Sequence, residues 1–146
     1  MSPSAAQLRN YVLSWILRIA LCAVFAYAGV EKWWGAREFV EQIANYQFLP
    51  QLAPWAALLL PPIEIASAVA LLLLPPVWRS ASALLMFGML LMFTVAMARA
   101  WSLGINIECG CFGKGSPTIG PLSFLRNGAL MAAAATFIVL DVPRTA

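Results

Sequence analysis

Two cysteines separated by a single glycine, Cys109 and Cys111, are the residues whose types and spacing point most directly to chemistry. Two thiols at this spacing can close a small disulfide ring, and Gly110 between them supplies backbone conformations that a side chain resists. A strained or exposed disulfide of this kind tends to be labile, and labile disulfides are the regulatory or catalytic ones. The pair therefore indicates thiol–disulfide exchange, with a static disulfide and a soft-metal chelate as alternatives.

Charged residues near this pair favour a reactive thiol. Lys114 follows shortly after it, and Arg126 with Asn127 opens the last apolar stretch on the same side as the cysteines. Positive charge and a helix N-terminus both favour the thiolate, which is the reactive form. We therefore expect Arg126 and Asn127 to support the site, although an arginine at a helix end often only reaches toward the membrane interface. The negative charge of Glu108 either disfavours the thiolate or allows this residue to serve as a proton acceptor.

A metal centre is the weaker interpretation of the cysteines. Two thiolates do not complete a tetrahedral site, and the chain has no histidine, the commonest metal ligand. We therefore predict no metal ligands, and we expect the third cysteine, Cys22, to be a small buried hydrophobe. A soft-metal (copper) transporter stays open, because methionine thioethers can pass Cu(I) along a helix. The methionines concerned are Met86, Met89, Met92 and Met97.

A polar pocket is predicted around Glu64, which lies near the middle of an apolar stretch just after Pro61 and Pro62. A charge at the bilayer centre costs on the order of 2.5–3.5 kcal/mol on insertion scales, so such residues usually face the bundle interior with a partner. The two prolines also leave backbone carbonyls without helical donors. The alternative is a protonated glutamate without a part in catalysis. The candidate partners of Glu64 are Lys32, Arg126 and Arg18.

The composition places the chain in a bilayer. Hydrophobic residues make up 62% of the 146 residues and charged residues 10%, whereas soluble domains are about 45–50% apolar and about 25% charged. The length suits a single membrane domain, 1–146. The net charge of +3 comes from scattered residues, so no basic patch indicates a nucleic-acid partner.

Four apolar stretches have the length of about 20 residues that a membrane-spanning helix needs. We predict an all-α, polytopic bundle with spans at about 11–30, 54–74, 80–100 and 122–140, and with the cysteines in a loop at 101–120. The first span resembles a signal peptide, but Arg18 interrupts its core, which favours a retained helix. The alanines at 132–135 let a neighbouring helix approach closely, within the bundle or in a homo-oligomer.

A short amphipathic helix is expected between the first two spans, lying on the membrane surface. Its predicted apolar residues are Phe39, Val40, Ile43 and Ala44, and its polar ones are Arg37, Glu38, Glu41 and Asn45.

Taken in order, these pieces resemble the MauE branch of the DoxX-like membrane proteins, named for methylamine utilisation. Cys109-Gly110-Cys111-Phe112-Gly113 is the most specific piece. The others are Ala28-Gly29 with Lys32, Tyr46 before Leu49-Pro50, Pro61-Pro62 with Glu64, and Arg126-Asn127.

The resemblance implies a redox-associated four-helix bundle in the bacterial inner membrane. MauE-type proteins are linked to maturation of methylamine dehydrogenase, whose small subunit carries many disulfides, and are thought to act beside a thioredoxin-like protein in the periplasm. Carried over here, Cys109 and Cys111 are the exchanging pair of a thiol–disulfide oxidoreductase, linked to the thioredoxin-like protein or to a quinone near Glu64 and Arg126. The non-enzymatic alternative is an assembly factor or anchor with a fixed disulfide.

The orientation in the membrane follows from chemistry rather than from charge. An even number of spans places both termini on one side, and the Lys and Arg residues are divided between the two sides without a clear excess. Disulfide chemistry belongs in an oxidising compartment. We therefore expect the cysteine loop in the periplasm and the termini in the cytoplasm.

Overall fold

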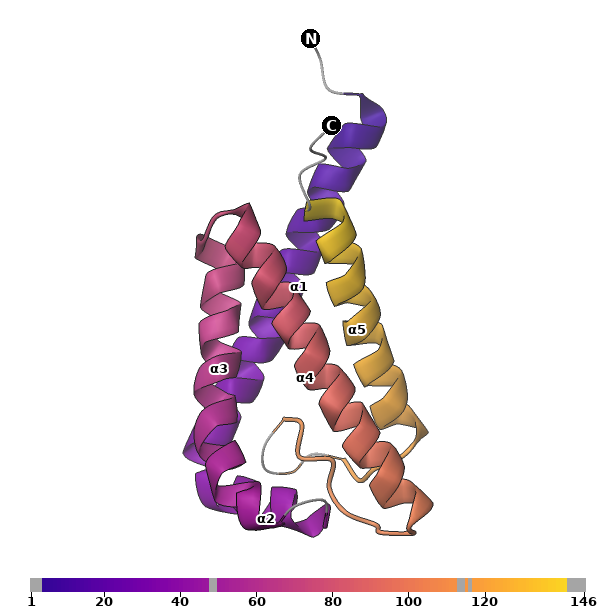
Figure 1. The fold of residues 1–146 in the computed structure, drawn as a ribbon. Helices are drawn as coiled ribbons and strands as arrows, with labels where there is room; N and C mark the ends of the chain where they lie inside the picture. Colours follow the sequence, from indigo (N-terminus) through magenta and orange to yellow (C-terminus); the bar gives the residue numbers. More distant parts are fainter. Residues whose placement is uncertain (1–3, 48–49, 113–114, 116, 142–146) are drawn as a thin grey trace.

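The computed structural model describes residues 4–47, 50–112, 115 and 117–141, and helices account for most of them. Among these residues an isolated bridge between Glu108 and Thr118 is the one β-type pairing. The prediction of an all-α chain is therefore confirmed (Figure 1). The elements are α1 (Ala5–Trp34), α2 (Ala36–Asn45), the 3-10 helix η1 (Pro50–Leu52), α3 (Ala53–Leu73), α4 (Pro76–Ser102) and α5 (Pro121–Asp141).

Four of the helices, α1, α3, α4 and α5, are long and apolar enough to cross a membrane. Their outward faces carry large apolar side chains such as Ile16, Leu84 and Val139, which are 58%, 63% and 78% exposed. Such a surface suits lipid, because a soluble protein rarely exposes contiguous apolar patches of this extent. The chain is a multi-pass membrane protein. The helices α1, α4 and α5 extend past the predicted spans at both ends, and α1 has 30 residues, whereas α3 is shifted by one residue from its predicted span.

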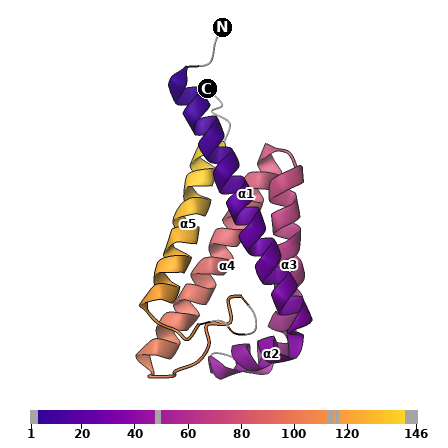
Figure 2. The same ribbon diagram turned by 180° about the vertical axis from the view of Figure 1, so that it is seen from behind.

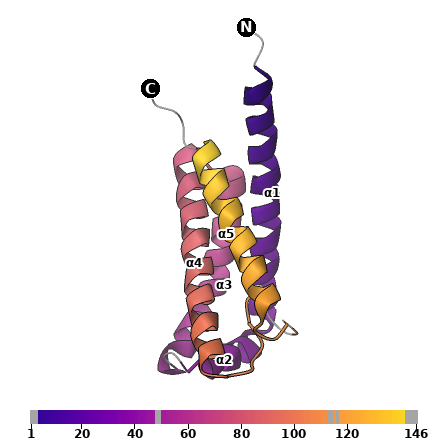
Figure 3. The same cartoon turned by 90° about the vertical axis from the view of Figure 1, so that its right-hand side faces the viewer.

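The helices form a bundle with two different ends. The start of α1, the end of α5 and the turn between α3 and α4 lie at one end, as an even number of spans requires (Figure 1). At the other end, α2 and the loop that carries the cysteines lie next to each other. Figure 2 shows α1 crossing the bundle obliquely, and Figure 3 shows α4 and α5 side by side.

The crossing of α1 and α3 is close because a glycine lies at the contact. A Cβ atom on Gly29 would lie 2.7 Å from Cγ1 of Ile65 and 3.0 Å from the backbone oxygen of Pro61. Residues three apart share a face of a helix, so Lys32 continues along the face of α1 that meets α3. The glycine thus sets the approach on which the placement of Lys32 depends.

Arg18 stabilises the end of α3 instead of pairing with Glu64. Its Nε donates to the backbone oxygen of Leu71 at 2.7 Å, and its Nη2 donates to the oxygen of Leu72. The last four carbonyls of a helix lack intrahelical donors, and α3 ends at Leu73. The arginine side chain therefore acts as a C-terminal cap within an apolar environment.

The predicted amphipathic helix is confirmed as α2, which follows α1 after Gly35. Phe39 is buried as expected, and Arg37 and Glu41 are exposed. Gln42 is also buried, although it is polar. It lies three residues after Phe39, on the side of α2 that covers the cysteine loop.

Candidate functional site

The loop between α4 and α5 turns back on itself so that both cysteine side chains lie inside the protein. The backbone N–H of Cys109 donates to the oxygen of Pro117 at 3.1 Å, and that of Ile119 donates to the oxygen of Ile107 at 3.0 Å. Gly110 has a φ of 66°, in the left-handed region that disfavours side chains. A Cβ there would also lie 3.1 Å from Oε1 of Gln42. Glycine is therefore required between the cysteines for two separate reasons.

Cys109 is held by residues from distant parts of the chain. Arg126, in the first turns of α5, donates from Nη2 to the Cys109 sulfur at 3.2 Å. Its guanidinium carbon lies 4.4 Å from the centre of the Phe112 ring, in a cation–π contact. The hydroxyl of Tyr46, at the end of α2, donates to the backbone oxygen of Cys109 at 2.5 Å. The structure thus brings Arg126 next to Cys109, one of the two cysteines that it was expected to support.

The two thiols have opposite protonation preferences. Hydrogen bonding from Cys111 and from Arg126 lowers the pKa of Cys109 to about 5, although burial opposes this change. The same hydrogen bond to the Cys109 sulfur, together with burial, raises the pKa of Cys111. Both cysteines are free thiols in this structure. In the reduced pair these effects favour a thiolate at Cys109 and a protonated thiol at Cys111.

The cysteines are less accessible than a labile, exposed disulfide would be. Cys109 is 0% exposed and Cys111 is 7% exposed, so a sulfur of another protein reaches Cys109 only if the loop moves. Glu108 is exposed, and its carboxylate accepts a hydrogen bond from Nε2 of Gln42 at 3.1 Å. This contact ties the loop to α2. Lys114, the other predicted cation, lies outside the described residues.

The polar pocket predicted around Glu64 is present, and Lys32 is its partner. Nζ of Lys32 donates to Oε1 of Glu64, and the two residues are 1% and 3% exposed. The ammonium also lies 5.4 Å from the ring centre of Phe39 and 5.1 Å from that of Phe93. Of the three candidate cations, Arg18 and Arg126 have the other partners described above.

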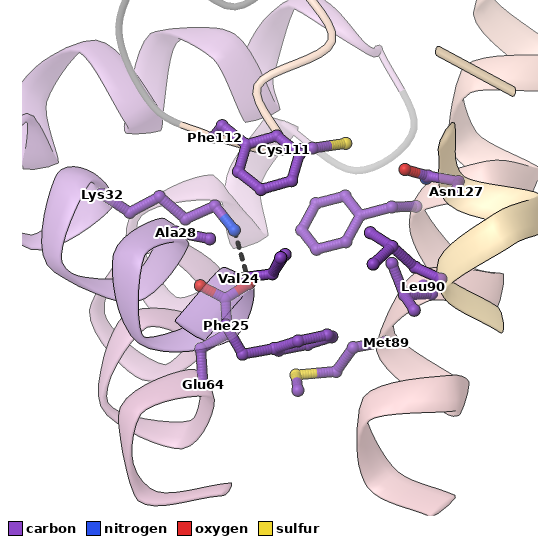
Figure 4. Close-up of a pocket in the computed structure, with 12 residues that line it drawn as sticks. Val24, Phe25, Ala28, Lys32, Glu64, Met89, Leu90, Cys111, Phe112 and Asn127 are labelled. Carbon is purple, nitrogen blue, oxygen red and sulfur yellow. Dashed lines mark hydrogen bonds and ion pairs between the residues drawn. The ribbon is translucent and has the colours of Figure 1, made fainter. Parts of the chain in front are cut away.

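A small cavity connects the ion pair with Cys111. It offers about 20 Å³ to the centre of a water molecule, and Figure 4 shows Lys32 and Glu64 on one side and Cys111 facing Asn127 on the other. Nδ2 of Asn127 donates to the hydroxyl of Thr94 at 3.3 Å. A quinone ring does not fit this cavity. The lining residues are Val24, Phe25, Ala28, Lys32, Glu64, Met89, Leu90, Phe93, Cys111, Phe112, Asn127 and Leu130.

The remaining sulfur-containing residues lie apart from this site or pack in the apolar core. Met86 and Met89 belong to one apolar cluster, with Cys22 packed against it, and Met97 belongs to the cluster that contains both loop cysteines. Met92 is exposed. Within the described part of the chain, no group of three or more His, Cys, Asp and Glu residues could hold a metal ion.

Two residues of the site were not predicted from the sequence. Gln42 was detectable as a polar residue on the apolar side of an amphipathic helix, three positions from Phe39. Phe93 had no such signal, because an aromatic residue in an apolar span resembles its neighbours. Tyr46 was recognised only as part of the family resemblance, and its role as a donor to the cysteine loop depends on the fold.

Arg126→Met is expected to raise the pKa of Cys109 by about 1–3 units, because a cation beside an acidic group favours its charged form. The midpoint at which thiolate ultraviolet absorbance appears in a pH titration would then move upward, measured with Cys22 replaced by alanine. Arg37→Met, at an exposed position of α2, is the control and should leave the midpoint of the thiolate titration unchanged. An unchanged midpoint in Arg126→Met would show that the 3.2 Å contact does not govern this thiol.

The comparisons with known proteins identify one family. The family described as methylamine utilisation protein MauE matches residues 10–140. The chain is 36% identical over 138 residues to methylamine utilization protein MauE of Paracoccus denitrificans, covering 88% of this chain and 72% of that relative. It is 35% identical over 133 residues to the MauE protein of Paracoccus versutus, covering 87% of this chain and 69% of that relative. It is also 35% identical over 127 residues to the MauE protein of Methylophilus methylotrophus, covering 82% of this chain and 63% of that relative. No solved structure matches the chain. The chain belongs to the MauE family.

Proposed function

We propose that this protein is a membrane thiol–disulfide exchange protein that acts through Cys109 and Cys111. The observation that carries the proposal is the Arg126 guanidinium on the Cys109 sulfur at 3.2 Å, with a second thiol two residues away across a glycine turn. A positively charged neighbour that lowers a thiol pKa is the usual sign of a nucleophilic cysteine. A purely structural pair has no need of a stabilised thiolate.

Exchange starts in the reduced state that the structure contains. The Cys109 thiolate attacks one sulfur of a partner's disulfide, a Cys109–partner mixed disulfide forms, and the partner's other sulfur leaves as a thiolate. Cys111 then attacks the Cys109 sulfur, which closes the Cys109–Cys111 disulfide and releases the partner's remaining thiolate. The pair loses two electrons and the partner's disulfide gains them. The reverse sequence transfers a disulfide to the partner.

The family supplies the biological setting of the proposal. The relatives are named as methylamine utilisation proteins, and we place this chain in maturation of a disulfide-rich methylamine dehydrogenase. Its partner is a thioredoxin-like protein of the periplasm. The cysteine loop and α2 lie together at the end of the bundle opposite the start of α1 and the end of α5 (Figure 1). A bacterial inner-membrane orientation with the cysteine loop in the periplasm therefore gives the partner one compact surface to approach.

Replacing each loop cysteine with serine tests the exchange. Cys111→Ser removes the thiol that resolves the mixed disulfide, so a covalent Cys109–partner complex should accumulate and appear on non-reducing gels. Cys109→Ser should accumulate none, because the nucleophile is missing. Cys22→Ser, at a half-buried position of α1 packed against the apolar core, is the matched control and should behave as the wild type. Absence of a trapped complex in Cys111→Ser, with methylamine-dependent growth retained in both loop variants, would contradict the proposal.

The burial of both sulfurs favours a second candidate, a non-enzymatic membrane anchor that helps assembly. In that function the loop is a fixed docking surface and the cysteines only stabilise it. The two candidates differ in one outcome. An anchor keeps supporting growth when both cysteines are replaced by serine, provided that the protein remains folded, whereas an exchange protein loses its function.

A further inference from the structure

The buried pair of Lys32 and Glu64 has no part in the exchange steps written above, although it shares a cavity with Cys111. We propose that Glu64 is the proton acceptor for Cys111, through a water molecule held in this cavity, and that Lys32 keeps Glu64 ionised for this purpose. The inference rests on the proposed exchange function and assigns a chemical role to a site away from the cysteine loop.

Cys111 needs such an acceptor because it must lose a proton before it can close the disulfide. In the mixed disulfide Cys109 carries no charge, but burial still raises the pKa of Cys111. Cys111 is 7% exposed, so it has little contact with bulk water. A thiol attacks a disulfide only as the thiolate. Closure of the pair is therefore slow unless a base inside the protein takes the proton.

Glu64 is the suitable base among the groups that face Cys111. Cys109 cannot serve once it is bonded to the partner, and the Tyr46 phenol, whose pKa is raised by burial and by the nearby cysteines, is a proton donor. The other neighbours are cations. The titratable and charged groups around Cys111 are Lys32 from α1, Tyr46 at the end of α2, Glu64 from α3, Cys109 in the loop and Arg126 from α5.

Two buried oxygens support the presence of a water. Oε2 of Glu64 and Oδ1 of Asn127 have no hydrogen-bond partner within the described residues, and both residues are almost fully buried. Unpaired buried polar atoms in native proteins usually mark a bound water or ion. A cavity needs roughly 10–15 Å³ of this kind of space for one water, and this one offers about 20 Å³. Asn127 points its oxygen toward Cys111 in Figure 4.

The proton transfer balances with the exchange steps. The Cys111 proton passes to the water, and a proton of the water passes to the Glu64 carboxylate, which becomes a carboxylic acid beside the Lys32 ammonium. The Cys111 thiolate then forms the S–S bond with Cys109 as the Cys109–partner bond breaks. When the disulfide is opened again, the acid returns the proton to Cys111 as it leaves. One carboxyl group thus serves both directions of electron flow.

The double variant Lys32→Met/Glu64→Gln tests the inference, because it removes the base without leaving a buried unpaired charge. The full chain with Cys22→Ala, in detergent, is treated with dithiobis-nitrobenzoate at acidic pH, which forms a mixed disulfide on Cys109 and releases one coloured thiolate. After a jump to neutral pH, attack of Cys111 on this mixed disulfide closes the Cys109–Cys111 disulfide and releases a second coloured thiolate. Loading should be unchanged, and closure should slow by about 100-fold, the usual scale of general-base catalysis. Closure should also become steeply dependent on pH, since hydroxide must replace the carboxylate.

Glu64→Asp is a second variant, which keeps a carboxylate to pair with Lys32 but places it on a shorter side chain. Glu41→Gln, at an exposed position of α2, is the control. Glu64→Asp should slow closure by less than the roughly 100-fold expected when the base is removed, and Glu41→Gln should leave the closure rate unchanged. Wild-type closure rates in the folded double variant, or in Glu64→Asp if the double variant does not fold, would overturn the inference. Failure of the wild type to load on Cys109, or release of both thiolates by Cys111→Ser, would instead overturn the exchange function itself.

Discussion

Gly29→Val is expected to destabilise the protein by about 1–3 kcal/mol, because added atoms at a well-packed contact force side chains and backbone apart. The new Cβ would lie 2.7 Å from the Ile65 side chain and 3.0 Å from the backbone oxygen of Pro61. The backbone oxygen cannot rotate away, so α1 and α3 must separate. Thermal unfolding of the detergent-solubilised protein measures the effect as a lower midpoint.

Gly88→Val is the matched control for this change, since nothing lies within 4 Å of a Cβ built on Gly88. Both variants make the same substitution within a membrane-spanning helix, so differences in helix propensity cancel. Equal unfolding midpoints for the two variants would show that α1 and α3 do not depend on a close approach at Gly29. The Gly29 variant should also slow closure of the cysteine pair, because Lys32 and Glu64 move apart with the helices.

Lys32→Met is expected to cost about 3–5 kcal/mol, the scale found when one partner of a buried ion pair is removed. The cause is the Glu64 carboxylate, which is 3% exposed and would be left without a cation. Replacing both residues, as in Lys32→Met/Glu64→Gln, should restore much of the stability, because no unpaired charge stays buried. Unfolding midpoints of Lys32→Met, of Glu64→Gln and of the double variant give the coupling energy between the two residues.

Arg9→Met, on an exposed position of the same helix, should change stability by less than about 0.5 kcal/mol, as surface substitutions usually do. If the double variant is as unstable as Lys32→Met, the cost arises from lost contacts of the lysine ammonium, such as those with Phe39 and Phe93, rather than from an unpaired charge. In that case the ion pair would be a packing feature, and Glu64 would not depend on Lys32.

The transmembrane helices were predictable because a bilayer accepts few alternatives. Only helices satisfy their own backbone hydrogen bonds over an apolar stretch of this length, so four stretches gave four spans. The helix ends were less predictable. Ser4 forms a capping box with Gln7, which starts α1 several residues before its apolar stretch. The length of the helix thus depends on local polar contacts that hydropathy does not register.

The site was predicted in part, and the missing part depended on the tertiary structure. The cost of burying Glu64 predicts that it has a partner, but the choice of Lys32 over Arg18 follows from the crossing of α1 and α3. The burial of Cys109 similarly depends on Tyr46 and Arg126, which are 63 and 17 residues away in the chain. Residue types therefore predicted a candidate site, and only the fold revealed that its thiols are buried.

The pH dependence of stability follows from the lowered pKa of Cys109. An unfolded chain holds this thiol near its ordinary pKa of about 8.5, whereas in the folded protein the pKa is about 5. The thiolate therefore contributes its full stabilisation above about pH 8.5. This contribution falls as the pH decreases toward the folded value, where Cys109 becomes protonated.

The hydrogen bond from Tyr46 to the Cys109 backbone has a kinetic consequence for the whole site. A thiolate of low pKa in open water would react with any small disulfide that diffused past it. Here the sulfur is fully covered, so its reaction rate is set by how often the loop separates from the end of α2. In the proposed exchange, a macromolecule that holds the loop open therefore reacts quickly, whereas a low-molecular-weight disulfide reacts only during spontaneous openings of the loop, and so more slowly.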